Sequence, residues 1–268
     1  MSNDYQPESA GARERAPDVR MTWENLLFVH WRVPAEVMRA LVPRELEIDL
    51  FDGSAWIGLV PFAMRRCDFA GVPRVGLPGL RDFYECNVRT YVRHTGVGGT
   101  RSGVWFFSLD AQTPLPVLGG RWLWNLNYVW SRFNVRQEGS TTAYKLVRRG
   151  VPGLGDGIPA RTDVRWRTVG DVLPQSQPGS IEHFLTERYW LFTQSRWTRG
   201  AHGGGGRILA GEVRHKPWSL SRAEVLHLDD TLVAAAGVRG GVRIEVQGEA
   251  IALASRSLDV LGYGLVAC

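Results

Sequence analysis

Polar and apolar side chains alternate most clearly in the run FYECNVRTYV, residues 83–92. In a β-strand, alternate residues share one face of the sheet. One face of this run would carry polar groups: Glu85, Asn87, Arg89 and Tyr91. The other face would be mostly apolar: Cys86, Val88, Thr90 and Val92. Such a polar row suits either a solvated sheet face or the inside of a β-barrel that binds a small polar molecule, and the rest of the sequence favours the barrel.

Similar apolar runs predict further strands, at residues 26–32, 55–62, 104–109, 189–197 and 208–215. A glycine-rich turn at residues 96–99 would join 83–93 to 104–109 as a hairpin. The four glycines at 203–206 would join 189–197 to 208–215 as a second hairpin. Many short strands with glycine turns and few helices indicate a mainly β fold, either a barrel or a sandwich.

Two short helices are expected between these strands. Pro34 suits the first turn of a helix, which Pro43 would end, and Ser180 could cap a helix over residues 181–185. Residues 1–20 predict a flexible tail, and residues 21–268 predict a single domain. The first twenty residues lack the apolar core of a secretory signal, and no apolar run approaches the ~20 residues that span a bilayer.

Composition narrows the functional classes. The net charge is +5, but no stretch concentrates basic residues, so neither nucleic-acid nor membrane binding is indicated. The three cysteines have no zinc spacing and form no disulfide framework, which favours reduced thiols and a cytoplasmic location. Eleven tryptophans favour large aromatic walls or a broad pocket. We therefore expect a small-molecule ligand, without a cofactor or a metal.

Few local motifs indicate chemistry. The four-glycine run lacks the ending of a phosphate-binding loop, and no Gly-x-Ser-x-Gly nucleophile motif occurs. Among the histidines, His183 is best explained as structural, whereas His30 and His215 flank tryptophans and are candidates to line a pocket. Cys86 is expected to be a small buried residue rather than a nucleophile.

Glu85 is the sharpest candidate for chemistry. It could pair with a neighbouring arginine on a solvated face. However, Phe83, Tyr84 and the strand 104–107 surround it with apolar residues. A carboxylate in such surroundings has a raised pKa unless an arginine compensates. Arg89 is a candidate to hold the charge of Glu85 or of an anionic ligand.

Three segments carry a family resemblance. They are the run HWRVPAEVMRALVPRELEIDLFDGSAWIGLVPF, the run FYECNVRTYV with VWFFSLDA, and the run HFLTERYWLF with VRHKPWSL. Together they resemble the DUF2071 family of uncharacterised proteins, which is related to the acetoacetate decarboxylase superfamily. The resemblance implies a largely antiparallel, cone-like β-barrel with an interior cavity and flanking helices. Oligomers are common in that superfamily, so the resemblance also allows a homo-oligomer of this chain.

The run Gly120-Arg121-Trp122-Leu123-Trp124-Asn125-Leu126-Asn127-Tyr128-Val129 differs from the decarboxylases in one respect. Gly120 and Arg121 match their motif. Tyr128 stands where the resemblance places the lysine that forms a Schiff base, and Asn127 replaces the preceding proline. Imine chemistry therefore does not carry over. Glu85 roughly matches the cavity glutamate of the decarboxylases.

The resemblance and the residues together predict an enzyme of lyase or isomerase type without imine chemistry. Glu85 would act as general acid or base, and Tyr128 would donate a hydrogen bond to a developing oxyanion. The expected substrate, which bears a carbonyl or carboxylate, would contact the following residues: Arg89, Asn87, Arg32, Arg121, His30 and His215. Enolisation, isomerisation, dehydration and decarboxylation all remain open. Two alternatives are a non-catalytic ligand-binding or sensing protein and a purely structural protein. Whether Lys216 reaches the cavity is also open.

Overall fold

The computed structural model describes residues 15–72, 79–96, 99–195, 206–238 and 240–268. The strands are β1 Val19–Val33, β2 Glu47–Ile48, β3 Ala55–Phe69, β4 Phe83–Gly96, β5 Gly99–Ala111, β6 Tyr128–Glu138, β7 Thr141–Arg148, β8 Arg161–Val172, β9 Trp190–Gln194, β10 Ile208–His215, β11 Leu220–Asp230, β12 Gln247–Gly262 and β13 Val266–Ala267. The helices are α1 Ala35–Leu41, α2 Pro114–Trp122, α3 Ile181–Thr186 and α4 Leu232–Val238. Every helix in these described ranges is too short or too polar to span a bilayer.

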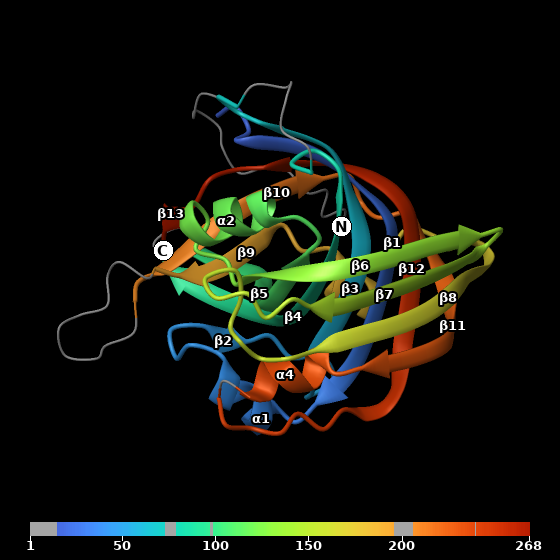
Figure 1. Cartoon of the computed structure of the whole chain (residues 1–268). Helices are drawn as coiled ribbons and strands as arrows, with labels where there is room; N and C mark the ends of the chain where they lie inside the picture. Colours follow the sequence, from blue (N-terminus) through green and yellow to red (C-terminus); the bar gives the residue numbers. More distant parts are fainter. Residues whose placement is uncertain (1–14, 73–78, 97–98, 196–205, 239) are drawn as a thin grey trace.

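The strands pair into a closed ring, which confirms the mainly β, barrel-like fold. Pairing runs through β5, β6, β7, β8, β11, β12, β1, β3 and β4 and returns to β5. Most neighbours are antiparallel, while β5 runs parallel to β6 and to β9. The additional pairing of β10 with β12 ties β9 and β10 across one side of the ring. Figure 1 shows α1 and α4 together near one end of the ring and α2 beside β9 and β10.

The predicted elements are largely present. Strands β4 and β5 form the first hairpin, with Gly96 opposite Gly99. Strands β9 and β10 form the second, although most of the glycine run that should join them lies outside the described residues. Helix α1 follows Pro34, and the Ser180 hydroxyl accepts the backbone N–H of His183 at the start of α3. Helix α2 was not expected, because its sequence PLPVLGGRW contains two prolines and two glycines.

Two hydrophobic cores lie on opposite faces of the shared strands, and strand alternation divides residues between them. In β4, Cys86, Val88 and Val92 pack into one core with α1 and α4. This placement confirms that Cys86 is a small buried residue. The opposite face of β4 looks toward the second core, which includes Phe83 and Tyr91. Because both faces of β4 are covered over residues 83–92, a polar residue in this stretch must be satisfied inside the protein.

A buried ion pair fixes β5, β6 and β7 to one another. Asp110 on β5 is fully buried and accepts hydrogen bonds from Ser131 on β6, at 2.8 Å, and from Nε of Arg148 on β7, at 2.9 Å. The Arg148 side chain is only 4% exposed and also lies 3.4 Å from Asp156. Burial of both partners makes this network costly to break, since each charge would be left unpaired.

We expect Arg148→Met to destabilise the protein by about 3–5 kcal/mol, because Asp110 and Asp156 would lose their buried cation. The matched control is Arg167→Met, which breaks a half-exposed pair with Glu224 and should cost about 0–1 kcal/mol. The free energy of unfolding in urea measures both. Equal losses in the two variants would contradict the structural role of Arg148.

Candidate active site

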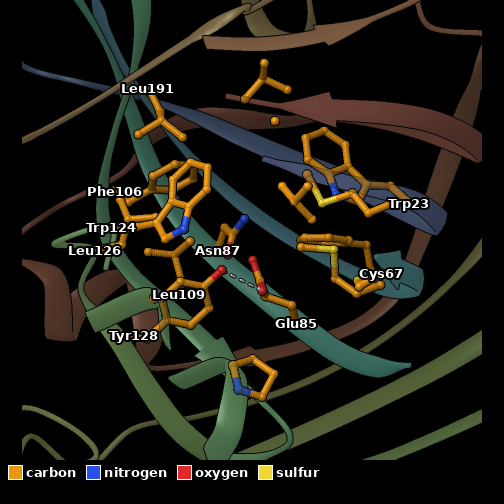
Figure 2. Close-up of a pocket in the computed structure, with 18 of the residues that line it drawn as sticks. Trp23, Cys67, Glu85, Asn87, Phe106, Leu109, Trp124, Leu126, Tyr128 and Leu191 are labelled. Atoms are coloured by element: carbon orange, nitrogen blue, oxygen red, sulfur yellow. Dashed lines mark hydrogen bonds between the residues drawn. The ribbon is translucent and has the colours of Figure 1, made fainter. Parts of the chain in front are cut away.

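A cavity of about 490 Å³ opens beside the polar face of β4. This size is typical of a small-molecule site. Most of its wall is apolar, and its aromatic residues include Trp23, Phe28, Phe62, Phe106, Trp124 and Trp218. Figure 2 shows the side chains of Glu85, Asn87 and Tyr128 together among these apolar groups.

The polar row predicted from strand alternation lies on the cavity wall. Glu85, Asn87 and Arg89 all line the cavity and are 1%, 7% and 9% exposed. Tyr128 joins them from the start of β6, which runs parallel to β5 with Tyr128 opposite Leu109. The row therefore faces an enclosed interior and not an open solvated surface.

Glu85 and Tyr128 contact each other directly. The Tyr128 hydroxyl donates a hydrogen bond to Oε2 of Glu85, at 3.1 Å (Figure 2). Burial raises the pKa of Glu85 to about 8, although hydrogen bonds from Tyr128 and Asn87 oppose this shift. Burial, together with Glu85, raises the pKa of Tyr128 well above its ordinary value. At neutral pH the cavity therefore presents a neutral carboxylic acid beside a neutral phenol.

The sequence predicted that Arg89 holds the charge of Glu85 or of an anionic ligand. The first of these alternatives was wrong, and the second stays a prediction. No ion pair joins Arg89 to Glu85, and within the described ranges no other cation pairs with Glu85. The two residues are four positions apart along β4, which places their Cα atoms about 13 Å apart in an extended strand. Arg89 instead donates from Nη2 to the Leu185 carbonyl at the end of α3, at 2.9 Å. Glu85 is left to respond to burial by keeping its proton.

The Gly120-Arg121 motif holds Tyr128 in place. A Cβ atom at Gly120 would overlap the Tyr128 ring, so only glycine fits there. Nη1 of Arg121 donates to the Tyr128 carbonyl, at 2.7 Å. Arg121 does not line the cavity, although the sequence predicted that it would contact substrate. In this structure it positions the backbone of Tyr128.

The backbone of Glu85 is fixed from the other side of its strand. Tyr144 on β7 is fully buried in the opposite core, and its hydroxyl donates to the Glu85 carbonyl, at 2.7 Å. The side chain of Glu85 therefore projects into the cavity from a backbone that is held by a second phenol.

Two further predicted site residues, His30 and Arg32, lie away from the cavity wall. His30 is fully buried, with Nε2 2.6 Å from the Tyr91 hydroxyl, and it packs where a Cβ at Gly58 would collide with it. Burial, assisted by the charge of Arg89, lowers its pKa well below the ordinary value. The guanidinium of Arg32 lies over Trp56 at the partly exposed end of β1.

His215 does line the cavity, as predicted, and stacks on Tyr189 with 4.7 Å between ring centroids. The neighbouring Lys216 is exposed and does not line the cavity. Lys145, the other lysine of the chain, lies 2.5 Å from Asp163 outside the cavity. His183 is partly buried in α3 and is not a lining residue either.

Sequence reasoning missed other lining residues, including Arg188, Cys67, Trp23 and Trp124. Arg188 is buried and donates to Asp49, at 2.6 Å, and to the Phe184 carbonyl, at 2.7 Å. Burial, together with Glu85, raises the pKa of Cys67 to about 12, so this residue stays a thiol at neutral pH. The abundance of tryptophan was the one feature of the sequence that indicated these aromatic walls. Over the described ranges, no group of three or more His, Cys, Asp or Glu residues is arranged to hold a metal.

Comparison with known proteins places the chain in a family. The DUF2071 profile, described as an uncharacterized conserved protein, matches residues 20–259. The uncharacterized protein YqjF of Bacillus subtilis (strain 168) is 31% identical over 238 residues, covering 89% of each chain.

Solved structures share the fold at low sequence identity. The enduracididine biosynthesis enzyme MppR, complexed with pyruvate, gives a TM-score of 0.62 at 14% identity, covering 97% of this chain and 94% of MppR. Acetoacetate decarboxylase from Legionella pneumophila gives a TM-score of 0.60 at 13% identity, covering 100% of this chain and 98% of the decarboxylase. An acetoacetate decarboxylase-like enzyme from Sphingomonas wittichii RW1 gives a TM-score of 0.58 at 12% identity, covering 95% of this chain and 94% of that enzyme. These similarities confirm the decarboxylase-like fold.

The raised pKa of Glu85 makes stability depend on pH. The folded protein keeps the Glu85 proton up to about pH 8, whereas the unfolded chain releases it near the ordinary value of 4.5. Stability should therefore fall as pH rises between these values, by up to about 1.4 kcal/mol per pH unit, and then level off. Glu85→Gln removes this penalty, so its stability relative to the wild type should rise over the same range. Urea unfolding at several pH values measures the difference, and the exposed Glu249→Gln serves as control. A pH-independent difference would contradict the assignment.

The crowding at Gly120 gives a second expectation. Gly120→Ala should destabilise the protein by about 1–3 kcal/mol, because the new methyl group overlaps the Tyr128 ring. Gly119→Ala is the matched control, since a Cβ there meets nothing within 4 Å and alanine favours the helix by about 0.5–1 kcal/mol. Thermal unfolding of the two variants should shift in opposite directions. A neutral Gly120→Ala would show that Tyr128 is free to move.

Proposed function

This chain belongs to the DUF2071 family, and we propose that it is an enzyme that performs acid–base chemistry on a small carbonyl-bearing molecule in its cavity, without an imine intermediate. The observation that carries the proposal is the Glu85–Tyr128 pair: a 1% exposed carboxyl group, hydrogen-bonded at 3.1 Å, on the wall of an apolar cavity. A carboxyl group that is kept neutral in an apolar site can donate a proton or a hydrogen bond at physiological pH. The decarboxylase-like fold neighbours support an enzyme of this superfamily.

Glu85 acts as the general acid in this proposal. Its neutral O–H donates to the carbonyl oxygen of the substrate as electrons move toward that oxygen from the neighbouring carbon. The bond that supplies those electrons is either C–C or C–H. In the C–C case the other fragment leaves without the bonding electrons, as carbon dioxide does in a decarboxylation, and in the C–H case a water molecule accepts the proton. The product is an enol in both cases. The Tyr128 hydroxyl and the Asn87 amide then stabilise the carboxylate that Glu85 becomes, since both already oppose the rise of its pKa.

The remaining cavity groups orient the substrate. Arg89, Asn87 and His215 line the same cavity as the reacting pair, and the arginine offers a charged, planar donor for an anionic group. No imine forms in this proposal, because neither lysine of the chain reaches the cavity. Both Lys145 and Lys216 lie off the cavity wall, and Tyr128 occupies the place that the resemblance gives to the reactive lysine.

Proton exchange tests the acid–base role without knowledge of the net reaction. The wild-type protein in D₂O should catalyse exchange of deuterium into the carbon next to the carbonyl of at least one ketone from a panel. NMR of the ketone measures the rate of exchange. Glu85→Gln should lower that rate by about 10²-fold or more, and Tyr128→Phe should also lower it, whereas Glu249→Gln should not. The wild-type rate should fall as pH rises through about 8, where Glu85 loses its proton.

Two results would contradict the enzyme assignment. The first is an equal exchange rate in Glu85→Gln and the wild type. The second is a small molecule retained in native mass spectrometry that binds tightly but never turns over, and this result would favour the alternative of a ligand-binding or sensing protein with the same cavity.

Borohydride treatment tests the absence of an imine. Because neither lysine lines the cavity, incubation with acetoacetate or another ketone followed by reduction should leave the protein mass unchanged. Intact-mass spectrometry provides the readout. A stoichiometric adduct that maps to Lys145 or Lys216 would overturn this part of the proposal.

A further inference from the structure

A second polar position in the cavity is built around Arg89. Its guanidinium is always charged, and the residue is only 9% exposed. No carboxylate lies within ion-pair distance among the described residues, and Nε has no hydrogen-bond acceptor there. Nη2 donates to the Leu185 carbonyl, at 2.9 Å, and the guanidinium lies 5.5 Å from the centroid of the Phe28 ring and 5.7 Å from that of Tyr91. A buried cation with a free N–H donor is costly unless an anionic partner completes it.

The carboxylates near Arg89 are already engaged by other groups. Asp49 lies 2.6 Å from Arg188. Glu187 accepts hydrogen bonds from the Trp218 backbone N–H, at 2.9 Å, and from the Tyr189 hydroxyl, at 2.7 Å. Arg188 and His215 also line this part of the cavity and add N–H-bearing side chains to it. An anionic group of a ligand is therefore the missing partner of Arg89.

The spacing along β4 limits the shape of that ligand. Glu85 and Arg89 share one face of the strand, with Cα atoms about 13 Å apart and Asn87 between them. The two side chains also reach toward different elements, since Arg89 donates to the Leu185 carbonyl of α3 and Glu85 accepts from Tyr128 of β6. In acetoacetate or pyruvate the carbonyl and the carboxylate are adjacent or one carbon apart, so an acid with a longer chain between these groups fits this arrangement better. The cavity volume of about 490 Å³ and its aromatic walls also leave room for a substantial apolar portion.

We propose that the substrate is an elongated, amphiphilic oxo acid, with its carboxylate at the guanidinium of Arg89 and its carbonyl oxygen at Glu85. The apolar chain or ring between these groups packs against cavity walls such as Phe106 and Trp124. The carboxylate subsite stands on the geometry of Arg89, whereas the position of the carbonyl rests on the function proposed above. A short keto acid would fill only one of the two subsites.

Binding of a graded ligand series tests this proposal. The probes are methyl-ketone carboxylic acids in which the chain between the two groups lengthens two carbons at a time, each paired with its methyl ester. Affinity is measured by calorimetry or by quenching of tryptophan fluorescence. Wild-type protein should bind the longer acids at least tenfold more tightly than acetoacetate, and at least tenfold more tightly than their own esters.

Variants separate the two subsites. Arg89→Met should lose the preference for acid over ester, while binding of the ester stays unchanged. Arg89→Gln keeps a donor for the Leu185 carbonyl and should show the same loss if Arg89→Met folds poorly. The control Arg132→Met removes an exposed arginine on β6 and should leave the preference intact. Glu85→Gln should keep the preference for acid over ester, even though it lowers deuterium exchange.

The outcomes are distinct from those of the proposed function. Equal binding of acids and esters by the wild type, or equal binding of acetoacetate and the longest acid, would overturn the elongated oxo acid. If deuterium exchange is absent but the carboxylate preference vanishes with Arg89, the anion subsite stands and the acid–base function fails. If exchange depends on Glu85 but the protein shows no preference for acids over esters, the acid–base function stands and the anion subsite fails.

Discussion

The central constraint on this protein is that strand β4 is covered on both faces. Its even positions fill a hydrophobic core, and its odd positions close a cavity. The carboxyl group of Glu85 is therefore almost fully removed from water, and it forms no ion pair with any cation in the part of the chain that the structure describes. The remaining way to lower its free energy is to keep a proton and to share hydrogen bonds with Tyr128 and Asn87. The acid character of the site follows from the fold, because the strand that presents Glu85 also removes it from solvent.

Much of the surrounding structure holds Tyr128 in place relative to Glu85. The buried pair of Asp110 and Arg148 joins β5 to β7 and reaches β6 through Ser131. Since Tyr128 begins β6, this network sets where the phenol stands relative to β4. Gly120 clears the space for the ring, and Arg121 holds its carbonyl. The position of the Tyr128 hydroxyl is thus set by three features: the Asp110–Arg148 network, the absence of a side chain at Gly120, and the hydrogen bond from Arg121. Such redundant support keeps a reactive geometry within narrow limits.

Local geometry explains which parts of the site could be predicted from sequence. The polar row of β4 follows from strand alternation alone, and Tyr128 follows from its place after Gly120-Arg121. Alternation gives the face of a strand, but it does not say which stretch of a long strand meets a cavity. Strand β1 has 15 residues and extends about 50 Å. Phe28 reaches the cavity, His30 is covered by Tyr91, and Arg32 lies near the strand end. Arg188, Trp23 and Trp124 lie far apart in the sequence, and only the closed ring brings them together.

The closing pair of the ring has a consequence for how the protein is made. Strand β1 is joined to β12, so residues 19–32 pair with residues 247–262. Synthesis proceeds from the N-terminus, and β1 must therefore remain without this neighbour until residues 247–262 have left the ribosome. Contacts between such distant segments slow folding, and an unpaired strand edge attracts other chains in the meantime. The time between translation of β1 and translation of β12 is the period in which this protein is most exposed to misassembly.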